Sequence, residues 1–435
     1  MQNELEFTDE AQAALDLMYG GHGHLFVTGA AGTGKSTLIR HFLATTSTQA
    51  VVLAPTGVAA LAVGGQTIHS FFRFGLGITP DKAGARHDEV KRLCERIDTF
   101  IIDEASMVRA DLFDCIERRL RTNGREPGTT FGGHQVVLVG DLYQLSPVVT
   151  EEQAGIFEGY YRSPYFFDAH VCRRIDLAVI ELTRVYRQDE SDYFAQMLAR
   201  MRLGEITDGD LTYLNQHVRQ PTLADLMERP LLAPLNSIID TANAKCLRTI
   251  KQPLVSIPGI VSGEFQARTV PTPDPLVLKE GARVMALANH PEREYVNGTL
   301  GVIESLEGMG EDGILFRSLD SGRMISVAPY EWERIRYVAV ADAIVTESIG
   351  TYTQYPFRLA YAMTIHKSQG KTLPGAIVSP GRGFFTFGQA YVALSRLSSD
   401  DDLWLTRAFR HEDILVDERV HAFYSQRVSR QMPLF

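Results

Sequence analysis

One short stretch constrains this chain more than any other: Gly29-Ala-Ala-Gly-Thr-Gly-Lys35-Ser36-Thr37. It follows the apolar run 25–27 and leads into a helical pattern, so it predicts a strand, a glycine turn and a helix. Glycines let the backbone fold around phosphate oxygens and point its N–H groups at them. Lys35 then meets the β- and γ-phosphates, and Ser36 reaches Mg²⁺. The pattern predicts a nucleoside triphosphate site, with a glycine-rich helix cap as the weaker interpretation. The residues expected to bind the nucleotide here are Gly29, Ala30, Ala31, Gly32, Thr33, Gly34, Lys35, Ser36 and Thr37.

Length and composition favour a globular protein of several domains. The 435 residues are too many for one core and should form about two to four domains. A hydrophobic fraction of 45% and a charged fraction of 22% are ordinary for folded proteins and exclude a disordered chain. The net charge of −10 decides little about a polyanionic partner, because a groove can be positive while the remaining surface is acidic.

Cysteine spacing and the chain's first residues bear on its compartment. The cysteines form no C-x-x-C pair, so neither a zinc site nor a disulfide framework is indicated, and we expect buried thiols in a reducing compartment. The start has no basic segment followed by an apolar one, and no apolar stretch is long enough to span a bilayer. We therefore expect a cytoplasmic protein with no membrane partner. The cysteines are Cys94, Cys115, Cys172 and Cys246.

Apolar β-type runs alternate with helical patterns along the chain. This alternation predicts an α/β fold with parallel sheets covered by helices, and two doubly wound units account for the runs. The opening helix is expected over 9–19, with Thr8 as its N-cap and one apolar face. Between 296 and 360, short strands broken by turns predict a small all-β insert. The expected strands of the parallel sheets are 25–28, 51–54, 100–103, 136–140, 177–182, 231–233, 376–379 and 403–405.

Two further apolar runs each end in polar side chains suited to phosphate chemistry. Asp103 follows the run 100–102 and would hold Mg²⁺, while Glu104 beside it could orient and deprotonate the attacking water. The run 136–140 delivers Asp141 and then Gln144, whose amide can report whether the triphosphate is intact. Taken alone, each pattern is more often a strand that runs into a solvated turn or a capped loop. The phosphate loop upstream reverses those odds for Asp103.

The order of these motifs resembles the superfamily 1 DNA helicases, and in particular the PIF (petite integration frequency) branch with its RecD-like relatives. The segment 111–148, which ends in the run that contains Phe-Gly-Gly-x-Gln, is similar to the signature stretch that separates PIF-type enzymes from other superfamily 1 members, although Ser146 stands where many members have proline. The resemblance implies two RecA-like domains, at 1–180 and 181–435, with a small barrel as the insert at 296–360. It also implies links to DNA repair, recombination, telomere maintenance and G-quadruplex DNA. The matching segments are 7–12, 29–37, 54–72, 101–107, 131–148, 182–188, 295–301, 361–372 and 391–396.

The resemblance also assigns roles around the nucleotide. Gln12 looks like the glutamine that reads adenine, and Gly370 is placed with the nucleotide-binding residues. Hydrolysis at a cleft between domains needs positive charge on the γ-phosphate from the facing domain, and Arg187 and Arg396 suit that task by their permanent charge and bidentate geometry. The expected cofactors are ATP and Mg²⁺, the latter held by Ser36 and Asp103.

Hydroxyls, amides and glycines near expected strand ends suit contacts to phosphates and sugars without sequence readout. The departure at 233–236 from a commoner Pro-Thr-Asn makes the assignment of Asn236 less secure. Phe71, Phe72 and Phe74 could stack on bases, although core packing is the stronger interpretation. The insert at about 73–98 could separate strands or merely pack against the domain. The expected DNA contacts are Pro55, Thr56, Gly57, Thr67, His69, Ser70, Asn236, Asn297, Thr364, His366, Lys367 and Gln369.

These observations together predict an ATP-dependent helicase that translocates on single-stranded DNA. Its expected partners are single-stranded DNA and forked or tailed duplexes, and we expect a monomer or a DNA-induced oligomer associated with the nucleoid. The 5′-to-3′ direction comes from the resemblance alone. Two alternatives stay open at this point: an ATPase that remodels DNA-bound protein without unwinding, and an RNA-directed helicase.

Overall fold

The computed structural model describes residues 7–75, 77–149, 157, 159–188, 191–265, 270–290, 292, 294–310, 313–319, 321–340 and 343–428. The chain forms two compact units. The first contains Met1–Asp189, Ile335–Ser348 and Val416–Phe435, and the second contains Glu190–Arg334 and Ile349–Leu415. The predicted domain boundary at 180/181 differs from this division, because 181–188 and two later segments lie with the first unit.

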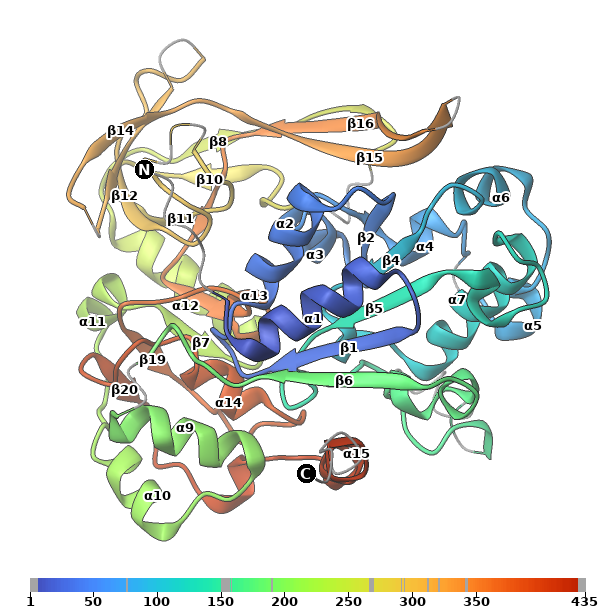
Figure 1. The fold of residues 1–435 in the computed structure, drawn as a ribbon. Helices are drawn as coiled ribbons and strands as arrows, with labels where there is room; N and C mark the ends of the chain where they lie inside the picture. Colours follow the sequence, from blue (N-terminus) through green and yellow to red (C-terminus); the bar gives the residue numbers. More distant parts are fainter. Residues whose placement is uncertain are drawn as a thin grey trace. The chain divides into compact units, whose positions relative to one another are not determined.

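The first unit is built on a six-stranded parallel sheet (Figure 1). Its strand order is β3-β2-β4-β5-β1-β6, and every neighbouring pair is parallel. The predicted strands from this part of the chain are confirmed to within a residue or two at each end. The strands are β1 (His24–Gly29), β2 (Ala50–Ala54), β3 (Gln66–Thr67), β4 (Thr99–Ile102), β5 (Gln135–Val139) and β6 (Leu177–Leu182).

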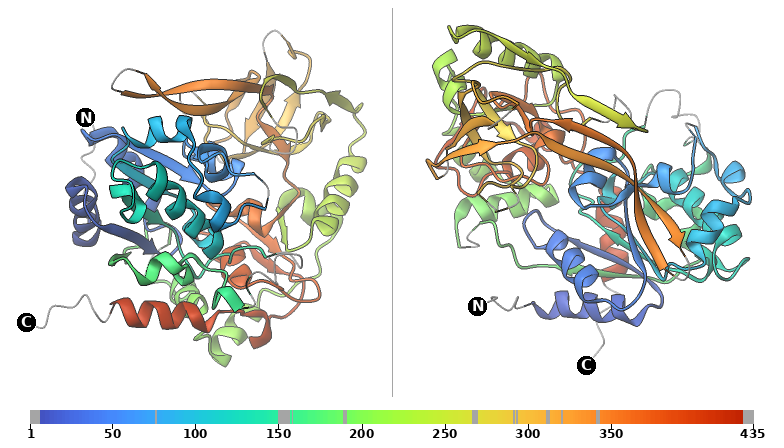
Figure 2. Two further views of the ribbon diagram at one scale, coloured as in Figure 1. Left: turned by 90° about the vertical axis from the view of Figure 1, so that its right-hand side faces the viewer. Right: turned by 90° about the horizontal axis from the view of Figure 1, so that it is seen from above.

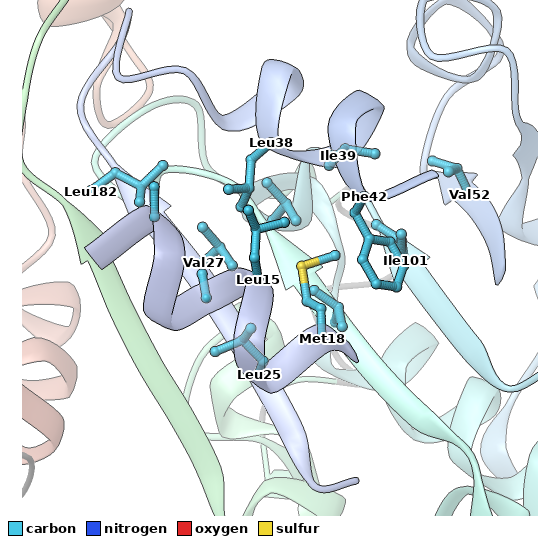
Figure 3. Close-up of a cluster of buried hydrophobic side chains, with 14 residues drawn as sticks. Leu15, Met18, Leu25, Val27, Leu38, Ile39, Phe42, Val52, Ile101 and Leu182 are labelled. Carbon is cyan, nitrogen blue, oxygen red and sulfur yellow. The ribbon is translucent and has the colours of Figure 1, made fainter. Parts of the chain in front are cut away.

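Helices α1 (Asp9–Gly20) and α2 (Lys35–Thr45) cover one face of this sheet (Figure 1). Side chains from α1, α2 and alternate strand positions form one apolar cluster, in which Leu15, Val27 and Phe42 are almost fully buried (Figure 3). The predicted first helix is confirmed, including the hydroxyl of Thr8, which accepts a hydrogen bond from the Ala11 N–H. The other helices of the unit are α3 (Gly57–Ala62), α4 (Ile68–Phe71), α5 (Pro80–Ala83), α6 (Asp88–Cys94), α7 (Ala110–Asn123) and α15 (Glu418–Val428).

An aromatic cluster fills the layer beneath the opposite face of the sheet. Phe71 and Phe72 meet edge to face at 4.8 Å between ring centroids, and Phe72 stacks on Phe74 at 5.4 Å. Phe100 of β4 contacts both Phe71 and Phe72. All four rings are buried, so the core-packing interpretation of the three phenylalanines after α4 is confirmed.

The second unit contains a four-stranded parallel sheet in the order β18-β7-β19-β20. Two doubly wound parallel sheets are therefore present, as the sequence predicts. The strands are β7 (Leu231–Ala233), β18 (Ala362–Thr364), β19 (Ala376–Val378) and β20 (Leu403–Leu405). The helices of this unit are α9 (Tyr193–Leu203), α10 (Asp208–Asn215), α11 (Leu223–Glu228), α12 (Asn236–Thr249), α13 (Ile365–Ser368) and α14 (Gln389–Leu394).

The all-β region begins before the predicted insert. Antiparallel strands in the order β14-β13-β12-β11-β17 surround an apolar core, and the first of these in sequence, β11, precedes residue 296. The small strands β8 and β10 form a pair, and β9 lies beside the long hairpin of β15 and β16 (Figure 2). The β character of 296–360 is confirmed, its expected start is wrong, and closure into a barrel stays a prediction. The strands are β8 (Val255–Ile257), β9 (Ile260–Gly263), β10 (Leu276–Leu278), β11 (Arg283–Ala286), β12 (Leu300–Ser305), β13 (Ile314–Ser318), β14 (Met324–Val327), β15 (Tyr330–Val340), β16 (Ala343–Gln354) and β17 (Phe357–Leu359).

Two further features of the structure concern the cysteines and the apolarity of the helices. All four cysteines are buried thiols. Across the described ranges, no helix combines the length and apolarity that crossing a membrane requires.

Candidate nucleotide site and nucleic-acid faces

The loop between β1 and α2 follows a path that only glycine accommodates. Gly29, Gly32 and Gly34 have φ values of 145°, 86° and 89°. A Cβ on Gly29 would lie 2.5 Å from the Leu182 carbonyl oxygen, and one on Gly32 would lie 2.8 Å from the Cβ of Arg187. The predicted glycine turn is therefore present, and the loop leads directly into the N-terminus of α2.

The ammonium group of Lys35 is held at this loop. Its Nζ donates hydrogen bonds to the carbonyl oxygens of Gly29 at 2.7 Å and Ala30 at 2.8 Å, and the Thr33 hydroxyl donates to the same Ala30 oxygen at 3.0 Å. Ser36 follows Lys35 in the first turn of α2. A helix N-terminus with a lysine beside it attracts a phosphate group, which is the chemistry predicted from the sequence.

Asp103 lies one residue beyond β4 and is buried. Burial raises the pKa of the Asp103 carboxyl, against the opposing effects of the Glu104 N–H, which donates to its Oδ1 at 2.9 Å, and of the positive charge on Lys35. Glu104 itself has a left-handed φ of 52°, which a residue other than glycine adopts at some cost. A buried carboxylate and the hydroxyl of Ser36 are the kind of oxygen donors that Mg²⁺ prefers, so the residues present fit this ion.

Gln144 is held by Asp141, to which the sequence analysis assigns no role in the site. After β5, the Gly140 N–H donates to the Val27 carbonyl oxygen at 3.1 Å, so this segment adjoins β1. The Gln144 Nε2 donates to the Asp141 Oδ2 at 3.3 Å, and the Tyr143 N–H donates to the Asp141 Oδ1 at 3.2 Å. Asp141 is therefore a positioning residue for Gln144. The sequence signal that could have identified Asp141 is its position just after the buried strand β5.

Arg187 belongs to the unit that carries the phosphate loop. The neighbouring Tyr186 N–H donates to the Gly32 carbonyl oxygen at 3.0 Å, and Arg187 itself packs on Gly32. The expectation that Arg187 comes from the facing domain is therefore wrong, because the chain stays beside the loop after β6. Its action on the γ-phosphate stays a prediction.

Gln12 is exposed on α1, where its Nε2 donates to the Asp16 Oδ1 at 2.8 Å. Its contact with adenine stays a prediction. The segment 8–11 before it is tied to the end of β6, because the Thr183 hydroxyl donates to the Glu10 Oε1 at 2.6 Å.

Arg396 lies in the second unit just beyond α14. Its Nε donates to the Val392 carbonyl oxygen and its Nη2 to the Ser395 Oγ, each at 2.9 Å. Its own carbonyl oxygen accepts from the Leu373 N–H at 2.9 Å, which joins it to the segment that contains Gly370. Gly370 has a φ of 77°. The nucleotide contacts expected of both residues stay predictions.

The same Thr-Ile-His corner occurs in both units. Thr67 ends β3 and its Oγ1 accepts from the Ser70 N–H at 3.2 Å, which caps α4. Thr364 ends β18 and its Oγ1 accepts from the Lys367 N–H at 3.3 Å, which caps α13. Each parallel sheet therefore presents a short helix N-terminus and a hydroxyl at a strand end. Both threonines are helix caps as well as candidate DNA contacts.

Each corner also places a histidine within its capped helix: His69 in α4 and His366 in α13. Burial lowers the pKa of both His69 and His366, and the charge on Arg109 lowers that of His69 further. Both imidazoles are therefore neutral near pH 7, and each offers one donor and one acceptor. Such groups can contact phosphates and sugars without a fixed charge.

The remaining predicted contacts lie at turns and helix starts. Thr56, between Pro55 and Gly57, caps α3 by accepting from the Ala59 N–H at 3.2 Å. Asn236 begins α12 and is exposed. Asn297 is exposed in the turn before β12, and the Gln369 N–H donates to the His366 carbonyl oxygen at 3.3 Å. The structure places these residues at strand and helix ends, and their contacts with DNA stay predictions.

Two cations near the second corner were missed from the sequence. Arg358 of β17 pairs with Met285 of β11, and the Lys371 Nζ lies 3.0 Å from the Met285 sulfur. Burial, with the charge on Arg358, lowers the pKa of Lys371 to about 8. Two neighbouring cations in partly desolvated positions favour an anionic group between or beside them. Lys371 was visible in the segment 361–372, but only the fold brings Arg358 to it.

Comparison with known proteins identifies the family. The profile of the PIF1-like helicase family matches residues 8–211. A protein from Bdellovibrio bacteriovorus named ATP-dependent DNA helicase Pif1 is 34% identical over 98% of this chain and 93% of its own length. The chain belongs to the PIF1-like helicase family.

Other members of the PIF1-like helicase family extend this comparison. The mouse protein named ATP-dependent DNA helicase PIF1 is 33% identical over 97% of the chain, which spans 63% of that relative's length. The crystal structure of Bacteroides sp Pif1 in complex with ADP-AlF4 has a TM-score of 0.89 and 32% identity and covers 98% of each chain. The structure of Bacteroides Pif1 bound to ssDNA has a TM-score of 0.71 and 33% identity over 98% of each chain. The predicted fold and family are thus confirmed.

Proposed function

We propose that this chain is an ATP-dependent DNA helicase that moves along single-stranded DNA in the 5′-to-3′ direction and separates the strands of a tailed duplex. One observation carries the proposal. The chain combines a phosphate loop, whose carbonyl oxygens hold the Lys35 ammonium, with two parallel sheets, and in each sheet one strand is followed by the same Thr-Ile-His corner. The DNA-bound structure of its Bacteroides relative supports the choice of single-stranded DNA.

Most residues proposed for hydrolysis belong to the first unit, and Arg396 belongs to the second. Lys35 and the N-terminus of α2 bind the phosphates, and Ser36 and Asp103 would hold Mg²⁺, which supplies a Lewis acid for the terminal phosphoryl group. Glu104 orients the attacking water and accepts its proton. Gln144, fixed by Asp141, contacts the terminal phosphate and reports its loss. Arg187 and Arg396 neutralise the charge that develops there.

The corners at Thr67 and Thr364 give each unit a grip on the DNA backbone. Hydroxyls, capped helix N-termini and neutral histidines hold phosphates without reading bases, which a motor on arbitrary sequence requires. Arg358 and Lys371 add positive charge to the second grip. We propose that alternate tightening of the two grips, driven by binding and hydrolysis of ATP, produces movement. A cytoplasmic site of action at the nucleoid belongs to the same proposal.

Strand displacement on tailed duplexes tests the proposal. The wild-type chain is expected to release the labelled strand from a 5′-tailed duplex in the presence of ATP, and not from a matched 3′-tailed duplex. Lys35→Ala is the control: it should abolish ATPase activity and unwinding while single-stranded DNA binding, measured by fluorescence anisotropy, changes little. Substantial ATPase activity in Lys35→Ala would contradict the assigned nucleotide site.

The same assay distinguishes the other functions. DNA-stimulated ATPase activity without strand release on either substrate would indicate a remodelling ATPase. Tighter binding to RNA than to DNA of matched sequence would indicate an RNA-directed enzyme. Release from the 3′-tailed duplex alone would reverse the proposed polarity.

A further inference from the structure

The last described helix of the chain, α15, belongs to the first unit although it follows the second unit in sequence (Figure 2). Its aromatic side chains fix it under the parallel sheet. Phe423 stacks on Phe167 at 4.6 Å between centroids and lies 6.2 Å from Phe26 of β1. Phe26 points to the face opposite α1 and α2, because neighbouring strand residues Leu25 and Val27 pack with those helices.

Tyr424 joins α15 to the start of the phosphate loop. Its hydroxyl lies 2.6 Å from the Thr28 Oγ1, and this hydrogen bond is buried. Thr28 immediately precedes Gly29, whose carbonyl oxygen accepts a hydrogen bond from the Lys35 ammonium. A buried bond between two neutral hydroxyls has little water to compete with it, so it fixes the end of β1.

Tyr143 joins the same helix to the loop that carries Gln144. Its ring stacks on that of Tyr424 at 5.2 Å with an interplanar angle of 16°, and its hydroxyl lies 3.0 Å from the His421 Nδ1. The Tyr143 N–H also donates to Asp141, which accepts from the Gln144 side chain. One turn of α15 therefore contacts the residues next to both the phosphate loop and Gln144.

We propose that α15 is a positioning element of the nucleotide site, in which Tyr424 acts through Thr28 and Tyr143 to set the phosphate loop and Gln144. This inference rests on the proposed function, since it assigns a role within the same site. In this proposal Tyr424 and His421 act only through Thr28 and Tyr143. Loss of the Tyr424 hydroxyl should loosen the loop, and the turnover number for ATP should fall about three- to tenfold, the range for one neutral hydrogen bond.

Two conservative variants isolate the hydrogen bond. Tyr424→Phe removes the hydroxyl and keeps the ring that stacks on Tyr143. Thr28→Val removes the hydroxyl on the other side with a side chain of similar shape. If the bond is the cause, each variant lowers the turnover number with little change in single-stranded DNA affinity, and the double variant is no worse than either alone. Phe423→Leu is the control for packing: it weakens the contacts of α15, including the edge-to-face contact of Phe423 with the Tyr424 ring at 5.6 Å, and keeps both hydroxyls of the hydrogen bond between Tyr424 and Thr28.

Hydrogen exchange in the nucleotide-free protein provides a readout independent of catalysis. Tyr424→Phe should speed the exchange of amides 30–36 at least threefold and leave those of α7 unchanged. Phe423→Leu should lower the melting temperature and leave the turnover number per folded molecule unchanged. Unchanged exchange at 30–36 in Tyr424→Phe, or an equal loss of turnover in Phe423→Leu, would overturn the proposal. A wild-type chain that fails to unwind DNA would overturn the proposed function instead, and the exchange result would still decide the role of α15.

Discussion

Replacement of Gly32 by alanine tests whether Arg187 packs against the phosphate loop within one unit. Two separate costs are expected. An alanine at a φ of 86° is in the left-handed region, which costs about 1–2 kcal/mol. Its Cβ would also lie 2.8 Å from the Cβ of Arg187, well inside the optimal carbon–carbon separation of about 3.5–4.0 Å, and relief of such a contact costs about 1–3 kcal/mol.

The two costs together predict that Gly32→Ala lowers the free energy of unfolding of the nucleotide-free protein by about 2–5 kcal/mol. Gly34→Ala is the matched control: its φ of 89° is nearly the same, but its Cβ would lie 3.8 Å from the nearest atom, on the Tyr186 ring. It should therefore carry only the conformational cost of about 1–2 kcal/mol.

A double-mutant cycle with Arg187→Gly isolates the steric part, because glycine lacks the Cβ that the introduced alanine side chain would meet. Urea denaturation followed by circular dichroism measures all four proteins. The cost of Gly32→Ala should fall to that of Gly34→Ala in the Arg187→Gly background. If Gly32→Ala costs no more than Gly34→Ala in the wild-type background, or if Arg187→Gly recovers nothing, then Arg187 does not pack where the structure places it.

Three further predictions concern charged and titratable groups. Arg396→Ala should lower the ATP turnover number about a thousandfold with a much smaller change in KM. Arg396→Lys should restore little of the turnover, because lysine lacks the planar guanidinium group. Steady-state kinetics that show an unchanged turnover number would exclude an arginine finger. Asp103→Asn keeps the shape of the side chain and removes its charge. The Mg²⁺ concentration needed for half-maximal ATPase activity should therefore rise at least tenfold, and an unaltered Mg²⁺ titration would contradict the metal assignment. Burial lowers the pKa of His134 to about 4, and its Nδ1 lies 2.9 Å from the Ile97 carbonyl oxygen. The unfolded chain therefore binds a proton at this histidine more readily than the folded chain does. Above pH 6.5 His134 does not lower the free energy of unfolding, and by about pH 4 it has lowered it by about 3 kcal/mol. His134→Asn, which keeps a donor to Ile97, should flatten that dependence in urea denaturation; an equally steep curve would assign it to other groups.

The sequence predicts the parallel sheets well because their strands are short, apolar and locally bounded. The run 177–182 matches β6, and 231–233 and 403–405 match β7 and β20. The glycine turn between β1 and α2 was predicted at the correct residues, because Gly29, Gly32 and Gly34 are required by local backbone geometry. These features depend on residues that are close in sequence, so they can be predicted from sequence patterns.

Features that depend on distant partners could not be predicted in this way. Strand β11 joins β12 and β17 only through cross-strand pairing. The predicted start of the all-β region at residue 296 is therefore too late in the chain. Arg187 was assigned to the wrong unit, because its motif does not reveal that the chain stays beside Gly32. The bond between Tyr424 and Thr28 joins residues 396 positions apart, and nothing local to either residue indicates it.

The path of the chain limits how the protein can be divided experimentally. It passes from one unit to the other at 189/190, 334/335, 348/349 and 415/416. No single cut yields a fragment that holds one complete unit alone: 1–334 carries most of both units, and 335–435 carries the complement of each. A protease nick at any of these points leaves two pieces that need each other to complete their cores, so the nicked protein should stay associated until it is denatured.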